Sequence, residues 1–202
     1  MPRVSLFAIL ALCVSITACS SIGIAPADLS AFEQTRVVDP SSLPQENVIE
    51  PGCVPTPFSA KQIHDAMPEY GGRYYALRGD SESSMVYYHF DNITATDCSV
   101  ETMFFDHEGL TSDTKTEHHV LWTDLQKHAS FARDEITITE VRLALIAGTF
   151  DCWNYTRDDA SPGRDELYFA KDLPGPPVYM RKIDAAGAVV FEMELRDFAP
   201  VK

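Results

Sequence analysis

Short runs of apolar and aromatic residues recur along the chain from about residue 74 to residue 195, and most of them alternate with polar residues. In the last run, Val189, Phe191, Met193 and Leu195 occupy every second position. A period of two places the apolar side chains on one face of a β-strand. The pattern predicts strands at 74–77, 85–90, 98–105, 136–139, 141–147, 149–155, 166–170, 178–183 and 188–195.

Turn-forming residues separate these runs at spacings near ten residues. Examples are the Gly71-Gly72 pair and the segment Asp184-Ala185-Ala186-Gly187. Many short strands joined by short turns favour an antiparallel sheet, whereas a parallel sheet would need a helix between strands. We therefore expect a mainly β fold with minor α content. The sheet is expected to be curved and antiparallel, forming a half-barrel or sandwich with one or two short helices.

Two capping boxes predict the helices. Ser59 is followed three residues later by Gln62, so each side chain can bind an otherwise unpaired backbone amide of the other. This helix is expected to end at Pro68. The same spacing of Thr123 and Gln126 predicts a second short helix near residues 124–130.

The first 18 residues have the pattern of an export signal. Arg3 supplies positive charge, and Val4–Ile16 is an apolar run of 13 residues, which is too short to span a bilayer comfortably. The run ends in Ile16-Thr17-Ala18-Cys19. These four residues resemble the lipobox of bacterial lipoproteins: an aliphatic residue, two small residues and a cysteine.

The resemblance covers residues 1–21 and implies that the chain is cut before Cys19, whose thiol is acylated. Several acyl chains would hold the protein stably on a membrane. Because Ser20 is not the aspartate associated with inner-membrane retention, the resemblance implies a periplasm-facing protein of the outer membrane. An ordinary secretory signal and an uncleaved anchor are the alternatives.

A change of composition follows the leader. Residues 19–52 are rich in proline and serine without sustained periodicity, so we expect a flexible linker behind the lipidated cysteine. In the alternative, residues 43–49 pack onto the domain as an extra strand. Residues 53–202 are expected to form the β-rich periplasmic domain.

The chain is strongly acidic. It has 16 Lys and Arg against 30 Asp and Glu, a net charge of −14. Removal of residues 1–18 takes away one base, Arg3, and leaves 15 − 30 = −15. Phosphate backbones repel such a surface, and no basic cluster offsets it, so nucleic acid is not an expected partner.

Three cysteines remain after the leader and Cys19: Cys53, Cys98 and Cys152. The periplasm permits disulfides. We expect one disulfide, with three pairings open and Cys98–Cys152 slightly preferred. A metal site is the competing interpretation, but the three cysteines lack a C-x-x-C spacing.

Histidines supply the main candidates for metal or catalytic chemistry. His118, His119 and His128 follow the acidic segment Asp106-His107-Glu108. Adjacent residues of a strand point to opposite faces, so His118 and His119 cannot both face one metal ion. The chain has no G-x-S-x-G elbow and no local cysteine–histidine signature. We therefore assign no catalytic residue, metal or cofactor.

A second resemblance concerns residues 135–198. The segments Ala147–Trp153, Tyr168–Ala170, Leu173–Val178 and Val189–Leu195 resemble the C-terminal half of uncharacterised β-rich envelope proteins. Those proteins are similar in outline to the half-barrels that carry lipoproteins or lipids across the periplasm. The resemblance implies an open, curved sheet with a helix or loop against its concave face, and it assigns no functional residue.

Three functional hypotheses follow. The first is a non-enzymatic binding module, anchored through Cys19, that holds an envelope component, either an apolar ligand or a protein. The second is a periplasmic hydrolase or metal-dependent enzyme that uses His118, His119 or His128. The third is a structural subunit of an envelope assembly.

Overall fold

The computed structural model describes residues 32–79, 83–158 and 163–199. Residues 1–31, with the expected leader and Cys19, lie outside this part of the chain. The helices are α1 (Ala60–Tyr70) and α2 (Trp122–Lys127). The strands are β1 (Phe32–Val37), β2 (Gly72–Gly79), β3 (Met85–Asp91), β4 (Asp97–Phe105), β5 (Thr111–Leu121), β6 (Ile136–Leu145), β7 (Gly148–Asp158), β8 (Gly163–Ala170), β9 (Tyr179–Asp184) and β10 (Val189–Ala199).

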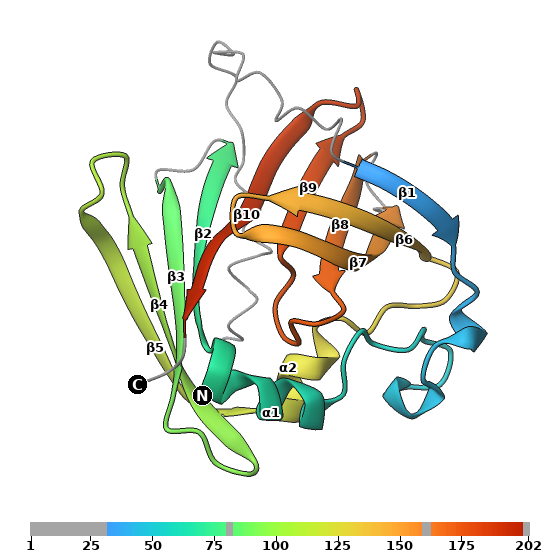
Figure 1. Cartoon of the computed structure of the whole chain (residues 1–202), viewed down its shortest axis with the longest axis horizontal. Coiled ribbons are helices and arrows are strands. Elements are labelled where there is room, and N and C mark those ends of the chain that lie inside the picture. Colours follow the sequence, from blue (N-terminus) through green and yellow to red (C-terminus); the bar gives the residue numbers. More distant parts are fainter. Residues whose placement is uncertain (1–31, 80–82, 159–162, 200–202) are drawn as a thin grey trace.

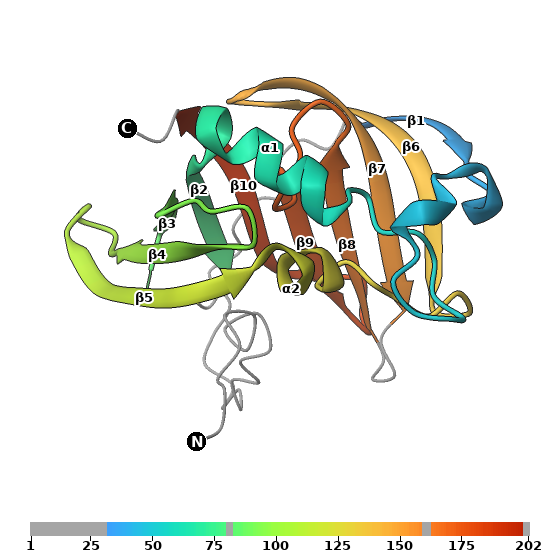
Figure 2. The ribbon, with the colours of Figure 1, turned by 90° about the horizontal axis from the view of Figure 1, so that it is seen from below.

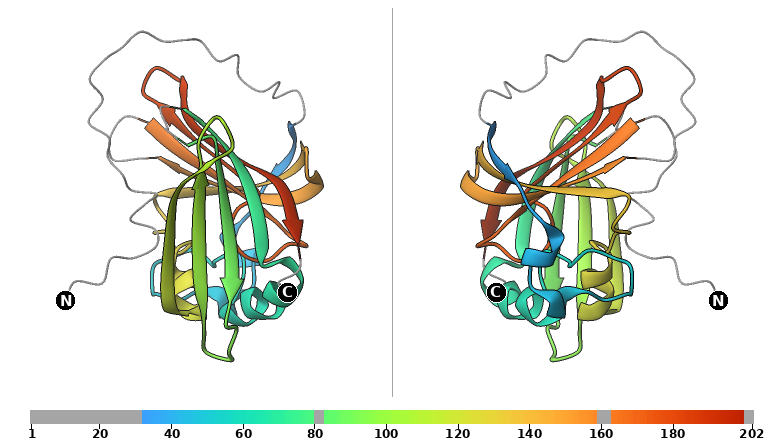
Figure 3. Two further views of the ribbon diagram at one scale, coloured as in Figure 1. Left: turned by 90° about the vertical axis from the view of Figure 1, so that its left-hand side faces the viewer. Right: turned by 90° about the vertical axis from the view of Figure 1, so that its right-hand side faces the viewer.

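All ten described strands form one antiparallel sheet in the order β1-β6-β7-β8-β9-β10-β2-β3-β4-β5. The sheet is open, since β1 and β5 lie at its edges, and it is strongly curved (Figure 1). The two helices lie close together against one side of the sheet (Figure 2), near one end of the molecule (Figure 3). The expected mainly β class and curved antiparallel sheet are confirmed. Neither helix of the described ranges has the length and apolar character needed to cross a bilayer.

The capping box at the start of α1 is confirmed. The Ser59 side chain accepts from the Gln62 amide, and the Gln62 side chain accepts from the Ser59 amide. The expected end at Pro68 is wrong, because the helix continues to Tyr70. A proline removes a hydrogen bond to the preceding turn, and here only two residues of helix follow it.

The second expected capping box does not form. The N-cap of α2 is Leu121, without a side-chain hydrogen bond, and the helix spans Trp122–Lys127. Gln126 turns instead toward α1, where its side-chain oxygen accepts from the amide of Ala60 at 2.9 Å. A tertiary contact therefore replaces the local cap.

The expected linker at 19–52 differs from the structure over its second part. β1 pairs with β6, and two short 3-10 helices, η3 (Pro40–Ser42) and η4 (Gln45–Asn47), follow it. Val38 is buried, and so is Asn47, whose side-chain amide donates to the Thr56 carbonyl and whose own carbonyl accepts from the Thr56 backbone amide. Residues 43–49 therefore pack onto the domain, as the alternative held, but as a 3-10 turn and not as a strand.

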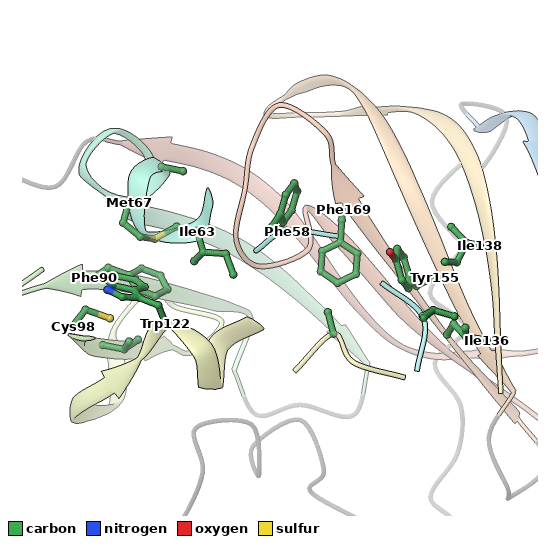
Figure 4. Packing of buried hydrophobic residues seen from close by; sticks show 14 of the residues in the cluster. Phe58, Ile63, Met67, Phe90, Cys98, Trp122, Ile136, Ile138, Tyr155 and Phe169 are labelled. Carbon is green, nitrogen blue, oxygen red and sulfur yellow. The ribbon is translucent and has the colours of Figure 1, made fainter. Parts of the chain in front are cut away.

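The central strands are buried on both faces. Tyr168 and Phe169 are successive residues of β8, so their side chains point to opposite faces, and both are less than 5% exposed. Phe169 packs with Phe58 and Tyr155 in the first hydrophobic cluster (Figure 4), whereas Tyr168 belongs to the second. Burial on both faces explains why apolar and polar residues do not strictly alternate along the sequence of β8.

Buried carboxylates on the Tyr168 face are paired. Glu166 accepts hydrogen bonds from the hydroxyl of Tyr168 at 2.7 Å and from Arg181 at 2.6 Å. Glu192 accepts from Tyr179 and lies 3.3 Å from Arg78. Such pairing offsets the free energy of removing these charges from water.

The expected disulfide is not formed, because Cys53, Cys98 and Cys152 are all free. Cys98 lies on β4 within the first cluster, and Cys152 lies on β7 within the second. Five strands separate β4 from β7 in the sheet. A disulfide requires Cα atoms within about 7 Å, so this sheet order does not allow the favoured pair.

Candidate binding cavity

An apolar cavity of about 80 Å³ lies between the two helices, the loop after β8 and one face of the sheet. Its sheet side consists of residues from β3, β8, β9 and β10: Tyr88, Phe90, Leu167, Phe169, Met180 and Met193. These residues come from segments far apart in the sequence, which only the curved sheet brings together. Two methionines in this wall give it adaptable packing, because thioether side chains are flexible and polarisable.

The helices supply the opposite wall. Pro57, Phe58 and Ile63 come from α1 and the segment before it, and Leu125 and Ala129 come from α2 and its C-terminal end. Figure 4 shows Phe58 and Ile63 on the side of the cluster toward α1, with Phe169 opposite Phe58. The helix that the Ser59–Gln62 capping box predicts thus supplies part of this wall.

The third wall consists of Gly175, Pro176 and Pro177, in the loop Leu173–Pro177, and a buried arginine holds this loop in place. Arg73 on β2 is fully buried, and its guanidinium donates to the carbonyl oxygens of Pro174 at 2.6 Å and Pro176 at 3.0 Å. Gly175 has φ +128°, and a Cβ atom there would lie 2.9 Å from Nη2 of Arg73. The loop therefore depends on glycine, both for its backbone and for its contact with Arg73.

Gln126 lines the cavity, but its side chain forms hydrogen bonds within the protein. Besides accepting from Ala60, its side-chain amide donates to Oγ1 of Thr56 at 3.0 Å. Thr56 in turn donates to the carbonyl of Phe58 at 2.9 Å. This chain of hydrogen bonds joins α2 to α1 and fixes the wall, so Gln126 is a positioning residue.

His128, the C-cap of α2, is the one imidazole in the wall. Burial lowers its pKa from the usual value, and the neighbouring Asp124 opposes that shift. Burial also raises the pKa of the Tyr88 phenol. No Asp, Glu, Lys or Arg of the described residues lines the cavity, so its wall is uncharged at neutral pH.

The candidate histidines are not brought together. His118 on β5 lies 3.2 Å from the hydroxyl of Ser99, and His119 is exposed with Asp97 at 3.5 Å. His128 belongs instead to the cavity wall. Within the described ranges, no group of three or more His, Cys, Asp or Glu residues could hold a metal ion.

The cavity has no signature in the sequence. The capping-box helix and the aromatic residues of the strands indicate buried apolar faces, but they do not indicate that these faces enclose a cavity. The role of Arg73 in holding the loop has no local signature, because its acceptors are 101 and 103 residues away.

Comparisons with known proteins inform the fold. No family model matches the chain, and no curated protein matches it. Among solved structures, the crystal structure of MucB is similar, with a TM-score of 0.50 and 10% sequence identity. The match covers 70% of this chain and 57% of MucB, so the chain spans little more than half of that protein. At this identity the similarity concerns the fold alone.

Proposed function

We propose that this protein is a non-enzymatic binding module of the bacterial envelope, held to a membrane by acylation of Cys19. Its ligand is an apolar group of another envelope component, and the cavity between α1, α2 and the sheet receives it. The observation that carries the proposal is the chemistry of the cavity wall, in which apolar and aromatic side chains converge without a charged residue.

The cavity volume limits the ligand. An engineered protein cavity of about 150 Å³ holds benzene, and sites for drug-sized molecules span about 300–1,000 Å³. A volume of about 80 Å³ lies below both values. The proposal therefore concerns a small apolar group, or the end of a larger one, inserted between the helices and the sheet.

The binding test uses the mature chain, residues 19–202, with Cys19→Ser, so that neither an acyl chain nor detergent competes. We expect isobutanol at millimolar concentration to shift the methyl resonances of Met180 and Met193 in NMR spectra, because both side chains line the cavity. Ala129→Leu should reduce these shifts, because Ala129 is a buried wall residue and leucine would fill the space.

Ala144→Leu is the matched control, because Ala144 is an exposed residue of β6 outside the cavity. It should leave the methyl shifts unchanged. Absence of any shift of the two methionine methyl groups up to the solubility limit of isobutanol would refute binding at this site.

The anchor has its own test. Cys19→Ser should release the protein from the membrane fraction, because the thiol that would carry the acyl chains is lost. Metabolic labelling with a tritiated fatty acid should label the wild-type protein and not the Cys19→Ser variant. If the variant remains in the membrane fraction after a carbonate wash, acylation of Cys19 is not what holds the protein.

A further inference from the structure

We infer that the occupant of the cavity is a single aliphatic side chain, presented by a basic segment of a protein partner, and not the acyl chain of a lipid. The inference rests on the proposed function and names the ligand class of the same site. Three observations carry it: the volume of the cavity, the position of its opening and the charge of the chain.

The volume suits a side chain. Benzene has six carbons and occupies a cavity of about 150 Å³, or about 25 Å³ per carbon, so roughly half that volume accommodates about three carbons, which is the number in a valine side chain and one fewer than in leucine. The 80 Å³ cavity has this size. An acyl chain of twelve or more carbons would need the helix wall or the loop wall to move, and these two walls are fixed by Gln126 and by Arg73.

The cavity opens to the surface at the partly exposed residues of its wall. These are Leu125 and the C-cap His128 of α2, Gly175 and Pro176 of the loop, and Tyr88 and Leu167 of the sheet, whereas Phe58 and Met180 are buried. A polypeptide segment that crosses this opening can insert one side chain and leave its backbone in water. Single anchor residues in desolvated pockets contribute much of the binding free energy in many protein complexes.

The charge selects the partner. The mature chain carries a net charge of −15, from 15 basic and 30 acidic residues after Arg3 is removed. Near His128 the exposed charges of α2 are Asp124 and Lys127, so the attraction of a basic segment comes from the net charge of the whole chain. A basic segment is attracted to such a surface, whereas a second copy of this chain and anionic lipid headgroups are repelled.

The experiment compares the binding of capped tripeptides and of a lipid-like probe to the mature protein with Cys19→Ser. Binding is followed through the methyl resonances of Met180 and Met193. We expect Lys-Leu-Lys to bind with a dissociation constant on the order of millimolar, since few atoms are buried. Lys-Ala-Lys should bind at least about fivefold more weakly, because alanine leaves the cavity unfilled. Asp-Leu-Asp should also bind more weakly than Lys-Leu-Lys, and this difference should shrink in 0.5 M salt.

Dodecyl maltoside below its micellar concentration is the lipid-like probe, because it has an apolar chain and no charge. Tighter binding of this probe than of Lys-Leu-Lys at the same methyl groups would overturn the inference and leave the proposed function intact. Equal binding of Lys-Leu-Lys and Lys-Ala-Lys would also overturn it. If isobutanol, the peptides and the detergent all leave the methyl resonances unshifted, the proposed function fails as well.

Ala129→Leu should abolish the difference between the leucine and alanine peptides, and Ala144→Leu should preserve it. Because a buried substitution can unfold a domain, circular dichroism of Ala129→Leu is recorded first. The methyl shifts of the unsubstituted protein locate the binding site even if that variant is unstable, so the comparison of peptides stands without it.

Discussion

Arg73 donates a hydrogen bond of 2.6 Å to the carbonyl oxygen of Pro174, although the two residues are 101 positions apart. Arg73 is the second residue of β2, shortly after α1, and Pro174 lies in the loop between β8 and β9. The bond therefore joins β2 to the loop that forms one wall of the cavity. A buried guanidinium that donates to carbonyl oxygens fixes a loop which has no regular backbone pairing of its own.

Arg73→Met should destabilise the domain. The substitution keeps much of the apolar volume but removes the donors to Pro174 and Pro176, so two carbonyl oxygens lose their partner. We expect the free energy of unfolding to fall by about 2–4 kcal/mol, measured by urea denaturation. Arg142→Met is the control at an exposed site, where the change should stay within about 0.5 kcal/mol. A loss of equal size in both variants would contradict the role of Arg73.

Gly175→Ala should destabilise the domain more than Gly109→Ala. Both glycines have positive φ, +128° and +78°, so both substitutions strain the backbone. Only at Gly175 would the new methyl group also lie 2.9 Å from Nη2 of Arg73, whereas Gly109 has open space around it. We expect the midpoint of thermal unfolding to fall further for Gly175→Ala than for Gly109→Ala. Equal midpoints would contradict the requirement for glycine at position 175 beside Arg73.

His128 should make stability depend on pH. Because burial lowers its pKa in the folded state, the unfolded chain takes up a proton first as the pH falls. The contribution of His128 is therefore fully present above the unfolded pKa of about 6.5 and is lost as the pH falls from there through the folded pKa. Thermal unfolding of the wild type and of His128→Gln between pH 5 and pH 8 measures this difference.

Ala144→Leu is the control, because this exposed position carries no titratable group. The stability difference between wild type and His128→Gln should shrink as the pH falls, while the difference between wild type and Ala144→Leu should stay nearly constant. A difference for His128→Gln that grows toward acid pH would have the wrong sign and would contradict the assigned shift.

The parts of the fold that were predictable have local causes. Nine runs of strand-like sequence correspond to eight strands, because the runs at 136–139 and 141–147 form the single strand β6. Strand β5 was missed because nearly all of its side chains are exposed, so it lacks the apolar alternation that marks a strand with a buried face. β1 was missed because its neighbourhood is rich in proline and serine. Pairing with a neighbouring strand, which is a tertiary effect, orders both edges.

The candidate site was less predictable, because tertiary contacts decide it. Gln126 has the spacing of a capping box but bonds to Ala60 and Thr56, more than 60 residues away. The prediction of a disulfide is wrong for a similar reason. Which cysteines lie close together depends on the order of the strands, and the spacing of the cysteines in the sequence does not encode that order. Local sequence signals thus predict the helices and most strands. The arrangement of the cavity walls depends on how the strands are ordered in the sheet, which these local signals do not specify.

The three thiols of the domain should react in two classes. Burial raises the pKa of Cys98 and Cys152 to about 12, so both stay protonated and shielded in the folded protein. Cys53 is only partly buried and should react with a thiol reagent such as dithionitrobenzoate under native conditions. On the mature chain with Cys19→Ser, we expect one thiol to react before urea is added and two more after unfolding without reductant. Cys53→Ser should remove only the first class. If only one thiol in total is counted after unfolding, two of the three cysteines are paired. If that one thiol is absent in Cys53→Ser, the pair is Cys98–Cys152, and their separation by the sheet order is incorrect.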